Sequence, residues 1–284
     1  MNGRARAPAA GTVLNALATG TGSAFAIDAY TSAEVTLSTD AAGVDGEIDD
    51  APDADTRLIE RCVELATERY GDGQGGSVRT ESEVPMASGL KSSSAAANAT
   101  VLATLDALGV ADEVDRETAC LLGVEAARDV GVTVTGAFDD ASASMLGGVT
   151  VTDNTDDELL ARDTVDWDVL VYTPPEQAFS ADADVERCER IAPIADLVAE
   201  LALDGRYGLA MTVNGFAFSA ALDFPTAPAV EALPEVAGVS LSGTGPSVVA
   251  VGDRKALEGV QERWDNRRGT TWLTTTQSTG AQTR

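Results

Sequence analysis

Between residues 85 and 98 a turn-rich loop runs directly into an alanine-rich helix. The segment reads Pro-Met-Ala-Ser-Gly-Leu-Lys-Ser-Ser-Ser-Ala-Ala-Ala-Asn, and the helical pattern continues to Leu108, where Gly109 ends it. Gly89 permits unusual backbone dihedrals and a close approach to a ligand. The serines that follow supply hydroxyls and free amides at a helix N-terminus, where the helix dipole favours anions. The segment therefore predicts a phosphate-binding loop.

A lysine stands at the start of this helix. Lys91 and Lys255 are the two lysines of a chain that carries 46 acidic residues. A compact ammonium group beside a helix N-terminus suits an anionic ligand. The residues alone leave a second interpretation open, because a serine-capped helix whose small side chains allow close packing has the same composition.

A second glycine-rich segment spans residues 240–251 and places the turn Gly243-Thr244-Gly245 between two apolar runs. Taken alone, this pattern fits a hairpin turn as well as a binding loop. The function of the segment therefore depends on what lies beside it in the fold.

The loop at residues 85–98 resembles the phosphate-binding motif of GHMP kinases, Pro-x-x-x-Gly-Leu-Gly-Ser-Ser-x-Ala. Lys91 stands where most of that superfamily has glycine, and the archaeal shikimate kinases share both the lysine and the triple serine. The resemblance implies that the phosphates of ATP are held by residues Pro85, Met86, Ala87, Ser88, Gly89, Leu90, Lys91, Ser92, Ser93, Ser94 and Ala95, which we call the phosphate loop. The pattern Gly-x-x-x-x-Gly-Lys-Ser/Thr does not occur, so a P-loop kinase is excluded.

Two other segments resemble GHMP kinase motifs. The segment at 240–251 resembles the third motif, which implies that Gly243, Thr244 and Gly245 help to close the site near the phosphates. Residues 10–28 resemble the first motif more loosely. Many family members carry a lysine after the glycine of that motif, and this chain has Thr12 there, so any catalytic help from a lysine at that position is missing.

The segment 135–142 resembles the part of the mevalonate kinase branch that carries the catalytic aspartate, which implies that Asp139 is the base. Without this context, one acid among 46 would be interpreted as a solvated surface residue. The resemblance also implies Mg²⁺, with Ser93 and Glu125 as its ligands. The spacing of Glu125 is not identical to that in related kinases, so a charge on a helix surface explains it almost equally well.

The resemblance implies an α+β protein with the GHMP kinase fold. It comprises an N-terminal ribosomal-S5-like domain over 1–155, with a left-handed βαβ unit, and a ferredoxin-like C-terminal domain over 164–284. The acidic segment 153–163 is interpreted as the junction between them. ATP would bind between the domains, and the activity implied is Mg²⁺-dependent phosphorylation of the 3-hydroxyl of shikimate, in chorismate and aromatic amino acid biosynthesis. An arginine should pair with the shikimate carboxylate.

Two alternatives stay open at this point. Another GHMP kinase would act on homoserine, mevalonate or pantoate, and one sequence does not resolve the substrate pocket. A nucleotide-binding protein that kept the fold without turnover would also fit the absence of a lysine at position 12. The oligomeric state is not encoded in any pattern that we recognise.

Hydrophobic periodicity and turn residues predict the order of the elements. We expect two strands within 11–38, a helix over 55–70, a strand over 77–84, helices over 92–108 and 112–128, a strand over 167–173, a helix over 182–203 that breaks at Pro193, and a helical or mixed segment over 207–222. The chain then reads strand, glycine turn, strand, helix, strand, and the Thr/Ser-rich tail over 274–284 is expected to be disordered.

The formal net charge is −27, yet 44% of the residues are apolar, so disorder is a poor interpretation. Scattered acids and few lysines predict a solvated acidic surface adapted to high salt. Such a surface repels nucleic acid and anionic membranes, so neither is expected as a partner.

The three cysteines, Cys62, Cys120 and Cys188, lie far apart within apolar helical patterns, which predicts buried free thiols and a reducing cytosol. No run reaches 18 apolar residues, so a membrane span is not expected. The N-terminal stretch superficially resembles a signal peptide but lacks a leucine-rich centre. A cytoplasmic location is therefore expected.

Overall fold

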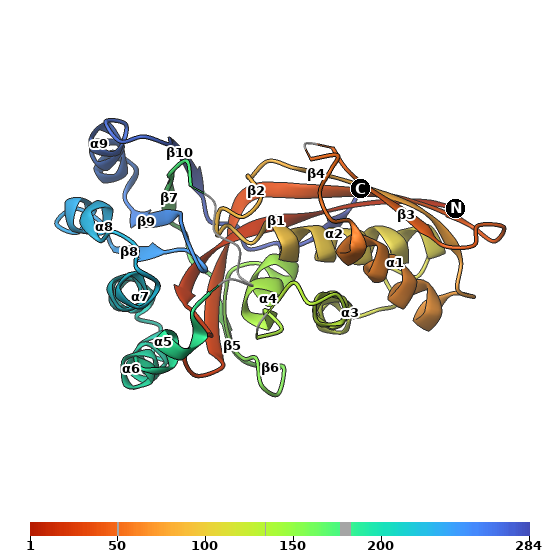
Figure 1. Ribbon diagram of the computed structural model, residues 1–284, viewed down its shortest axis with the longest axis horizontal. Coiled ribbons are helices and arrows are strands. Elements are labelled where there is room, and N and C mark those ends of the chain that lie inside the picture. The colour runs from red at the N-terminus through yellow and green to blue at the C-terminus, as the bar shows by residue number, and fades with distance from the viewer. Residues whose placement is uncertain (50, 134, 177–182) are drawn as a thin grey trace.

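The computed structural model describes residues 1–49, 51–133, 135–176 and 183–284 (Figure 1). In these residues the chain forms a seven-stranded sheet and a four-stranded sheet. The first sheet has the order β11–β1–β2–β4–β3, and β5 and β6 continue it from the side of β2. Its strands are β1 (Asn2–Leu14), β2 (Thr21–Ser38), β3 (Val44–Ile48), β4 (Gly75–Ser82), β5 (Val149–Asp153), β6 (Glu158–Asp163) and β11 (Gln282–Thr283).

The long strand β2 explains how this sheet is organised. Its second half, residues 31–38, pairs with β4, and its first half, residues 21–25, pairs with β5. The second half alternates between buried and more exposed side chains, as expected for a strand with one face in water, whereas residues 22–27 are buried without interruption. The first half of β2 is therefore covered on both faces.

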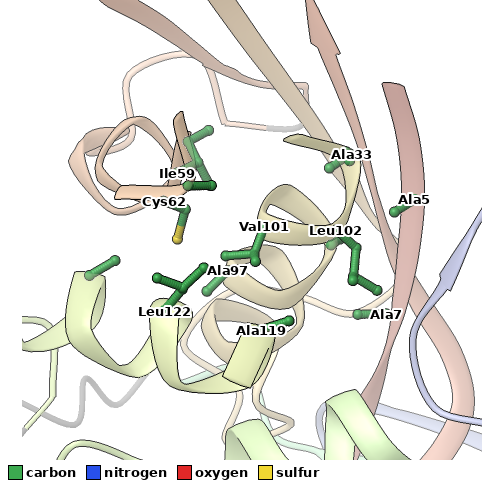
Figure 2. Packing of buried hydrophobic residues seen from close by; sticks show 14 of the residues in the cluster. Ala5, Ala7, Ala33, Ile59, Cys62, Ala97, Val101, Leu102, Ala119 and Leu122 are labelled. Atoms are coloured by element: carbon green, nitrogen blue, oxygen red, sulfur yellow. The ribbon is translucent and has the colours of Figure 1, made fainter. Parts of the chain in front are cut away.

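The described residues of this half of the chain form four helices, and α2 is the central one. They are α1 (Arg57–Tyr70), α2 (Ser92–Leu108), α3 (Arg116–Asp129) and α4 (Phe138–Leu146). Figure 2 shows α2 with β1 and β2 on one side and α1 and α3 on the other. A Cβ at Gly3 of β1 would stand 2.1 Å from the carbonyl oxygen of Ala103. Small residues therefore allow α2 to pack closely on β1. This packing does not conflict with a binding role for the N-terminus of α2.

The connection β3–α1–β4 joins two parallel strands. It matches the βαβ unit expected in the N-terminal half, and its left-handed sense stays a prediction. Helix α3 begins at Arg116, a few residues later than expected, because the Asp115 side chain caps it by accepting a hydrogen bond from the Thr118 amide at 2.9 Å.

The second sheet is antiparallel throughout and has the order β10–β7–β9–β8. Its strands are β7 (Asp168–Thr173), β8 (Gly238–Leu241), β9 (Val248–Gly252) and β10 (Thr270–Thr275). In chain order this arrangement is fourth, first, third, second, with helices between the first and second strands and between the third and fourth. This is the strand order of a ferredoxin-like fold, as the resemblance implied.

The helices of this half are α5 (Val185–Glu189), α6 (Ala192–Leu203), α7 (Tyr207–Leu222), α8 (Ala227–Ala232) and α9 (Arg254–Trp264). Leu170 and Ala250 face α8 and α9. Val169 and Val171 lie on the opposite face, in a core that also contains Phe25 of β2. The two sheets therefore share apolar core, and Phe25 meets Trp167 edge to face at 5.9 Å between ring centroids.

The acidic segment 153–163 is not a junction between the two sheets. It forms a turn followed by β6, which pairs with β5 inside the first sheet. The chain crosses to the second sheet only after Asp163, just before β7 begins at Asp168. The proposed domain limits of 1–155 and 164–284 stay a prediction.

The prediction of a disordered tail over 274–284 was wrong. Residues 274 and 275 complete β10, and β11 pairs with β1, with Ala5 opposite Thr283 and Arg6 opposite Gln282. The Arg6 guanidinium also donates to Gln282 Oε1 at 3.1 Å. The open edge of β1 supplies backbone partners, so this polar segment is ordered without burying large apolar side chains.

Several other predicted helices, and the predicted state of the cysteines, can be compared with the structure. The helices expected over 92–108 and 207–222 correspond to α2 and α7, and Pro193 lies in the first turn of α6. Residue 182, the expected start of the preceding helix, is outside the described residues. The helices α4 and α8 were not predicted. The three cysteines are free and buried, and no helix of the described chain is long and apolar enough to cross a membrane.

Candidate active site

The phosphate loop follows β4 and ends in the first turn of α2. Its backbone is left-handed at Ala87, Gly89 and Lys91, with φ values of 53°, 84° and 64°. Two of these residues are not glycine, and such conformations cost about 1–3 kcal/mol each, a cost that proteins retain mainly at functional sites. A Cβ at Gly89 would stand 2.2 Å from the Ser242 carbonyl oxygen. Only glycine fits this close contact.

The C-terminal segment 242–247, which we call the glycine loop, packs directly on the phosphate loop. Ser242 Oγ donates to the Gly89 carbonyl at 2.8 Å, and the Ser247 amide donates to the Ser88 carbonyl at 3.2 Å. Residues more than 150 positions apart in sequence are thus brought together. The structure therefore places Gly243, Thr244 and Gly245 in the loop that lies beside the phosphate loop.

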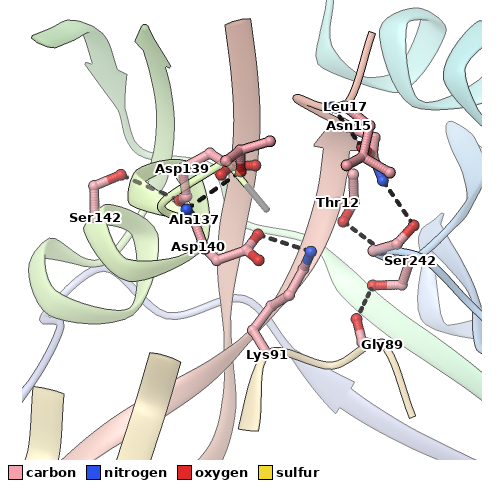
Figure 3. A network of polar contacts seen from close by, with 12 residues as sticks. Thr12, Asn15, Leu17, Gly89, Lys91, Ala137, Asp139, Asp140, Ser142 and Ser242 are labelled. Atoms are coloured by element: carbon pink, nitrogen blue, oxygen red, sulfur yellow. Dashed lines mark hydrogen bonds and ion pairs between the residues drawn. The ribbon is translucent and has the colours of Figure 1, made fainter. Parts of the chain in front are cut away.

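The end of β1 holds the glycine loop from its other side. The Gly243 amide donates to Thr12 Oγ1 at 2.8 Å, and Asn15 Nδ2 donates to the Gly243 carbonyl at 2.9 Å (Figure 3). Thr12 is almost completely buried. Position 12 therefore holds the glycine loop in place through its hydroxyl, a function that a lysine there would not supply.

Helix α2 begins with free amides that face this meeting point. Lys91 is its N-cap residue and makes no side-chain cap, so the described chain offers the first amides of α2 no side-chain acceptor. Of the three serines, Ser93 is exposed and Ser94 is buried. An anion bound here would meet amides, hydroxyls and the positive end of a 17-residue helix.

Asp139 lies in the first turn of α4 and is only 4% exposed. A Cβ at Gly22 of β2 would stand 2.6 Å from its carboxylate, so the glycine makes room for it. Asn154 holds the carboxylate, because its Nδ2 donates to Asp139 Oδ1 at 2.7 Å and its Oδ1 accepts from the Asp139 amide at 3.1 Å. Asp139 Oδ2 accepts no hydrogen bond from the described residues.

Asn154 is itself fixed by its neighbours. Thr152 Oγ1 donates to Asn154 Oδ1 at 2.7 Å, and Arg128 donates to the Asn154 carbonyl at 3.3 Å. The guanidinium of Arg128 is also held by both carboxylate oxygens of Asp157, at 2.6 and 2.7 Å. Since Asp157 engages both of its terminal nitrogens, Arg128 orients this turn and is not assigned as the partner of a substrate carboxylate.

Burial is the main influence on the acidity of Asp139. Burial and the neighbouring charge of Asp140 raise the pKa of Asp139 to about 7, whereas the Lys91 ammonium and the hydrogen bond from Asn154 oppose the rise. A carboxyl group that titrates near neutral pH is suited to accept a proton from a hydroxyl. Asp139 is thus a buried carboxyl and not a solvated surface acid, and its role as the base stays a prediction.

Lys91 joins the phosphate loop to this acidic pair. Its ammonium lies 2.7 Å from Asp140 Oδ1, and its side chain is only 7% exposed. A Cβ at Gly243 would stand 3.0 Å from the same nitrogen. Figure 3 shows Lys91 between Asp140 and the contact of Thr12 with the glycine loop. Three regions that were singled out separately in the sequence thus converge on one ammonium group.

Glu125 is not brought to this site by any described contact. It lies on α3 and pairs with Arg69 of α1 at 3.1 Å, with its side chain 43% exposed. Gly123, two positions earlier, faces Ala97 of α2, so Glu125 points to roughly the opposite side of α3. No cluster of three or more acidic, cysteine or histidine side chains able to hold a metal occurs in the described ranges. A metal-binding role for Ser93 and Glu125 stays a prediction.

Sequence reasoning missed several residues of the site. Gly22, Asn154 and Asp140 contact the candidate base or its neighbour, and Thr12 was noted only for the lysine it lacks. Asn154 lies in an acid-rich segment where a polar residue is unremarkable, and only its burial reveals its role. No local pattern could have indicated that β5 ends beside the first turn of α4.

Comparisons with known proteins place the chain in a family. The model of the GHMP kinases N terminal domain matches residues 57–148, which include α1, the phosphate loop and Asp139. Proteins named shikimate kinase are similar over nearly the whole chain. The protein from Halobacterium salinarum is 69% identical over 283 residues, 100% of both chains, and that from Methanococcoides burtonii is 51% identical over 265 residues, 93% of this chain and 92% of the relative.

Solved structures share the fold at low identity. A homoserine kinase from Cytophaga hutchinsonii has a TM-score of 0.76 at 18% identity and covers 100% of this chain and 97% of its own. The mevalonate kinase of Methanococcus jannaschii has a TM-score of 0.76 at 14% identity. The match covers 96% of this chain and 98% of the mevalonate kinase.

The shared fold, the phosphate loop on a helix N-terminus and the full-length relatives together define a small-molecule kinase, and the chain belongs to the GHMP kinase family. Within that family it groups with the archaeal proteins named shikimate kinase. It differs from the Halobacterium salinarum protein at fewer than a third of the positions.

Proposed function

We propose that this chain is an ATP-dependent shikimate kinase that transfers the γ-phosphoryl group of ATP to the 3-hydroxyl of shikimate. The products are shikimate 3-phosphate and ADP. The observation that carries the proposal is the position of Asp139, a buried carboxylate that shares one polar network with the lysine of the phosphate loop. The relatives named shikimate kinase, at 40–69% identity with nearly complete coverage, support the choice of substrate.

The phosphates of ATP are held by the phosphate loop and by the first amides of α2. Phosphoryl transfer depends on positioning and charge neutralisation more than on covalent chemistry. The glycine loop packs on Gly89 and, through Ser242 and Ser247, fixes the backbone that would contact the phosphates. Residues 85–95 together with Gly243, Thr244 and Gly245 form the nucleotide site in this proposal.

Asp139 accepts the proton of the acceptor hydroxyl. Asn154 occupies its Oδ1, so Oδ2 is the oxygen left to receive the proton. The hydroxyl oxygen then bonds to the γ-phosphorus, and the bond from that phosphorus to the ADP oxygen breaks. Gly22 keeps the space beside Oδ2 free of a side chain.

Mg²⁺ supplies charge neutralisation on the phosphates when it is bound. It usually binds to proteins through one or two side chains together with substrate phosphates, so the lack of an acidic cluster in the described part of the chain does not conflict with its use. The exposed hydroxyl of Ser93 at the start of α2 fits one ligand position. Glu125 is engaged by Arg69 and has no support from the described contacts as the second ligand.

The proposal also covers the partners of the enzyme and the salt content of its surroundings. A net charge of −27 favours a protein that does not bind nucleic acid and that works in a salty cytoplasm. Shikimate and ATP are then its partners. Kinases that use other acceptors share the fold, as the homoserine and mevalonate kinase structures illustrate, so the acceptor has to be tested directly.

An assay of ADP formation from ATP across four acceptors tests this proposal. We expect shikimate-dependent ADP formation that stops when Mg²⁺ is chelated. Faster turnover of homoserine, mevalonate or pantoate would reject the substrate assignment. Nucleotide binding without ADP formation from any of the four acceptors would support a protein that has kept the fold without catalysis.

A further inference from the structure

The side chain of Lys91 turns inward, in contrast to the other lysine of the chain. Lys255 is exposed at the start of α9, whereas the side chain of Lys91 is 7% exposed and ends 2.7 Å from Asp140 Oδ1. Burying an ammonium group is costly unless it is paired, so its position reflects a specific arrangement. Its backbone is also left-handed, with φ of 64°, a conformation that a residue with a side chain seldom adopts.

The charges around this ammonium are divided between two adjacent carboxylates. Asp140 pairs with Lys91, and Asp139 is hydrogen-bonded by Asn154. Among the described contacts, this arrangement leaves Asp139 Oδ2 without a hydrogen bond while a positive charge stays nearby. Without Lys91, the triphosphate of ATP would approach two neighbouring carboxylates with no cation between them among the described contacts.

The ammonium also lies where three motifs meet. It is close to Gly243, whose amide is bonded to Thr12. Thr12 occupies the position where a lysine would be expected from the resemblance, and its hydroxyl is committed to the glycine loop. A positive charge is nevertheless present beside position 12, and it comes from the phosphate loop.

We infer that Lys91 is a catalytic residue that bridges the transferring phosphoryl group and the base Asp139, and that Asp140 is the positioning residue that holds its ammonium there. This role rests on the proposed function and goes beyond phosphate binding by the loop. In the transition state the ammonium stabilises the charge that develops on the transferred group, where one preorganised donor contributes about a hundredfold to a thousandfold in rate.

The test uses Lys91→Met, with Lys255→Met as the matched control. Methionine faces the same left-handed backbone cost as lysine, so the substitution removes the charge without relaxing the loop. We expect turnover to fall about a hundredfold or more, while the dissociation constant of ADP rises less than about tenfold because the amides of the loop and of α2 remain. Lys255→Met should match the wild type in both measurements.

The titration of the Asp139 carboxyl, followed by carbon NMR and assigned with Asp139→Asn, gives a readout that needs no substrate. Lys91 lowers and Asp140 raises the pKa of Asp139. We therefore expect the titration to move to higher pH in Lys91→Met and to lower pH in Asp140→Asn. Asp140→Asn should also reduce turnover, by about tenfold, because the ammonium loses its partner.

Several results would overturn the inference. A fall in ADP affinity as large as the fall in turnover, with the Asp139 titration unmoved, would make Lys91 a phosphate ligand only. A lower melting temperature with proportional loss of both measurements would make it structural. Because the NMR titration does not depend on the acceptor, opposite shifts in the two variants would support the geometry even if shikimate proved to be the wrong substrate.

Discussion

Asp139 has one carboxylate oxygen bonded to Asn154 and the other without a hydrogen bond from the described residues, and this asymmetry is what its proposed role requires. We predict that Asp139→Asn lowers turnover by two or more orders of magnitude, because the amide keeps the shape but cannot accept the proton. Nucleotide affinity should change little. Asp156→Asn, at an exposed acid on the turn before β6, is the control and should be silent. Near wild-type turnover in Asp139→Asn would remove this residue from the mechanism.

The raised pKa of Asp139 also predicts how stability depends on pH. Its value of about 7 lies above the ordinary 3.8, so the folded state holds the proton more tightly than the unfolded state. The contribution of protonated Asp139 to the free energy of unfolding is fully present below about pH 4 and is lost as pH rises through about 7. Asp139→Asn lacks this loss, so its melting temperature relative to wild type should be higher at pH 8 than at pH 5. A constant difference across that range would contradict the assignment.

Asn154 offers a test of the hydrogen bond itself. Its bond to Asp139 lowers the pKa of that carboxyl, so Asn154→Ala should move the acidic limb of kcat/KM to higher pH. The limb in the wild type should lie near neutral pH, with activity rising as Asp139 loses its proton. We do not expect Asn154→Ser to restore the acidic limb of the wild-type pH profile, because the serine side chain is too short to reach Asp139. An unmoved limb in Asn154→Ala would show that another group controls the profile.

The candidate site depends on one loop from each half of the chain. Thr12 at the end of β1 accepts the Gly243 amide, so Thr12→Val should leave that buried amide without its acceptor. We predict a loss of about 1–3 kcal/mol in the free energy of unfolding and weaker ADP binding. Chemical denaturation and equilibrium ADP binding measure the two effects. Unchanged ADP affinity, with stability reduced, would mean that the glycine loop does not contribute to nucleotide binding.

Local sequence predicted some elements well and others not at all. Helix α2 was predictable because the phosphate loop precedes it, apolar residues recur through it and Gly109 ends it. Helix α4 was missed because it is only nine residues long and because its Asp139 amide is held by the side chain of Asn154, just after β5, a partner that local sequence does not show. The tail was missed for a similar reason, since β1 supplies the hydrogen bonds of β11.

The whole molecule carries a net charge of −27, and this charge favours a dependence on salt. Most ion pairs of the described chain have at least one exposed side chain, and pairs exposed on both sides, such as Arg4 with Glu34, contribute only about 0–1 kcal/mol each. Screening of the general repulsion should therefore outweigh the weakening of these pairs. We predict that the melting temperature rises between 0.1 and roughly 2 M KCl. A maximum at low ionic strength would contradict this prediction.

The resemblance to GHMP kinases predicted the fold class and the strand order of the second sheet. Its motifs also gave the phosphate loop and Asp139 as candidates for the site. It did not give the arrangement of Lys91, Asp140 and Asn154 around the base. That arrangement depends on how β1, β5 and α4 meet, and its contacts join residues of different elements, 15 positions apart for Asn154 with Asp139 and 231 for Gly243 with Thr12. Local patterns cannot encode such contacts.

In the proposed reaction this chain phosphorylates shikimate with Asp139 as the base. Incubation of the wild type and of Asp139→Asn with ATP, Mg²⁺ and shikimate, with the products identified by phosphorus and proton NMR, tests it most directly. We expect one ADP for each shikimate 3-phosphate formed by the wild type, and at least a hundredfold slower formation by the variant. A phosphate on another hydroxyl, no phosphorylated shikimate at all, or equal rates for the two proteins would contradict it.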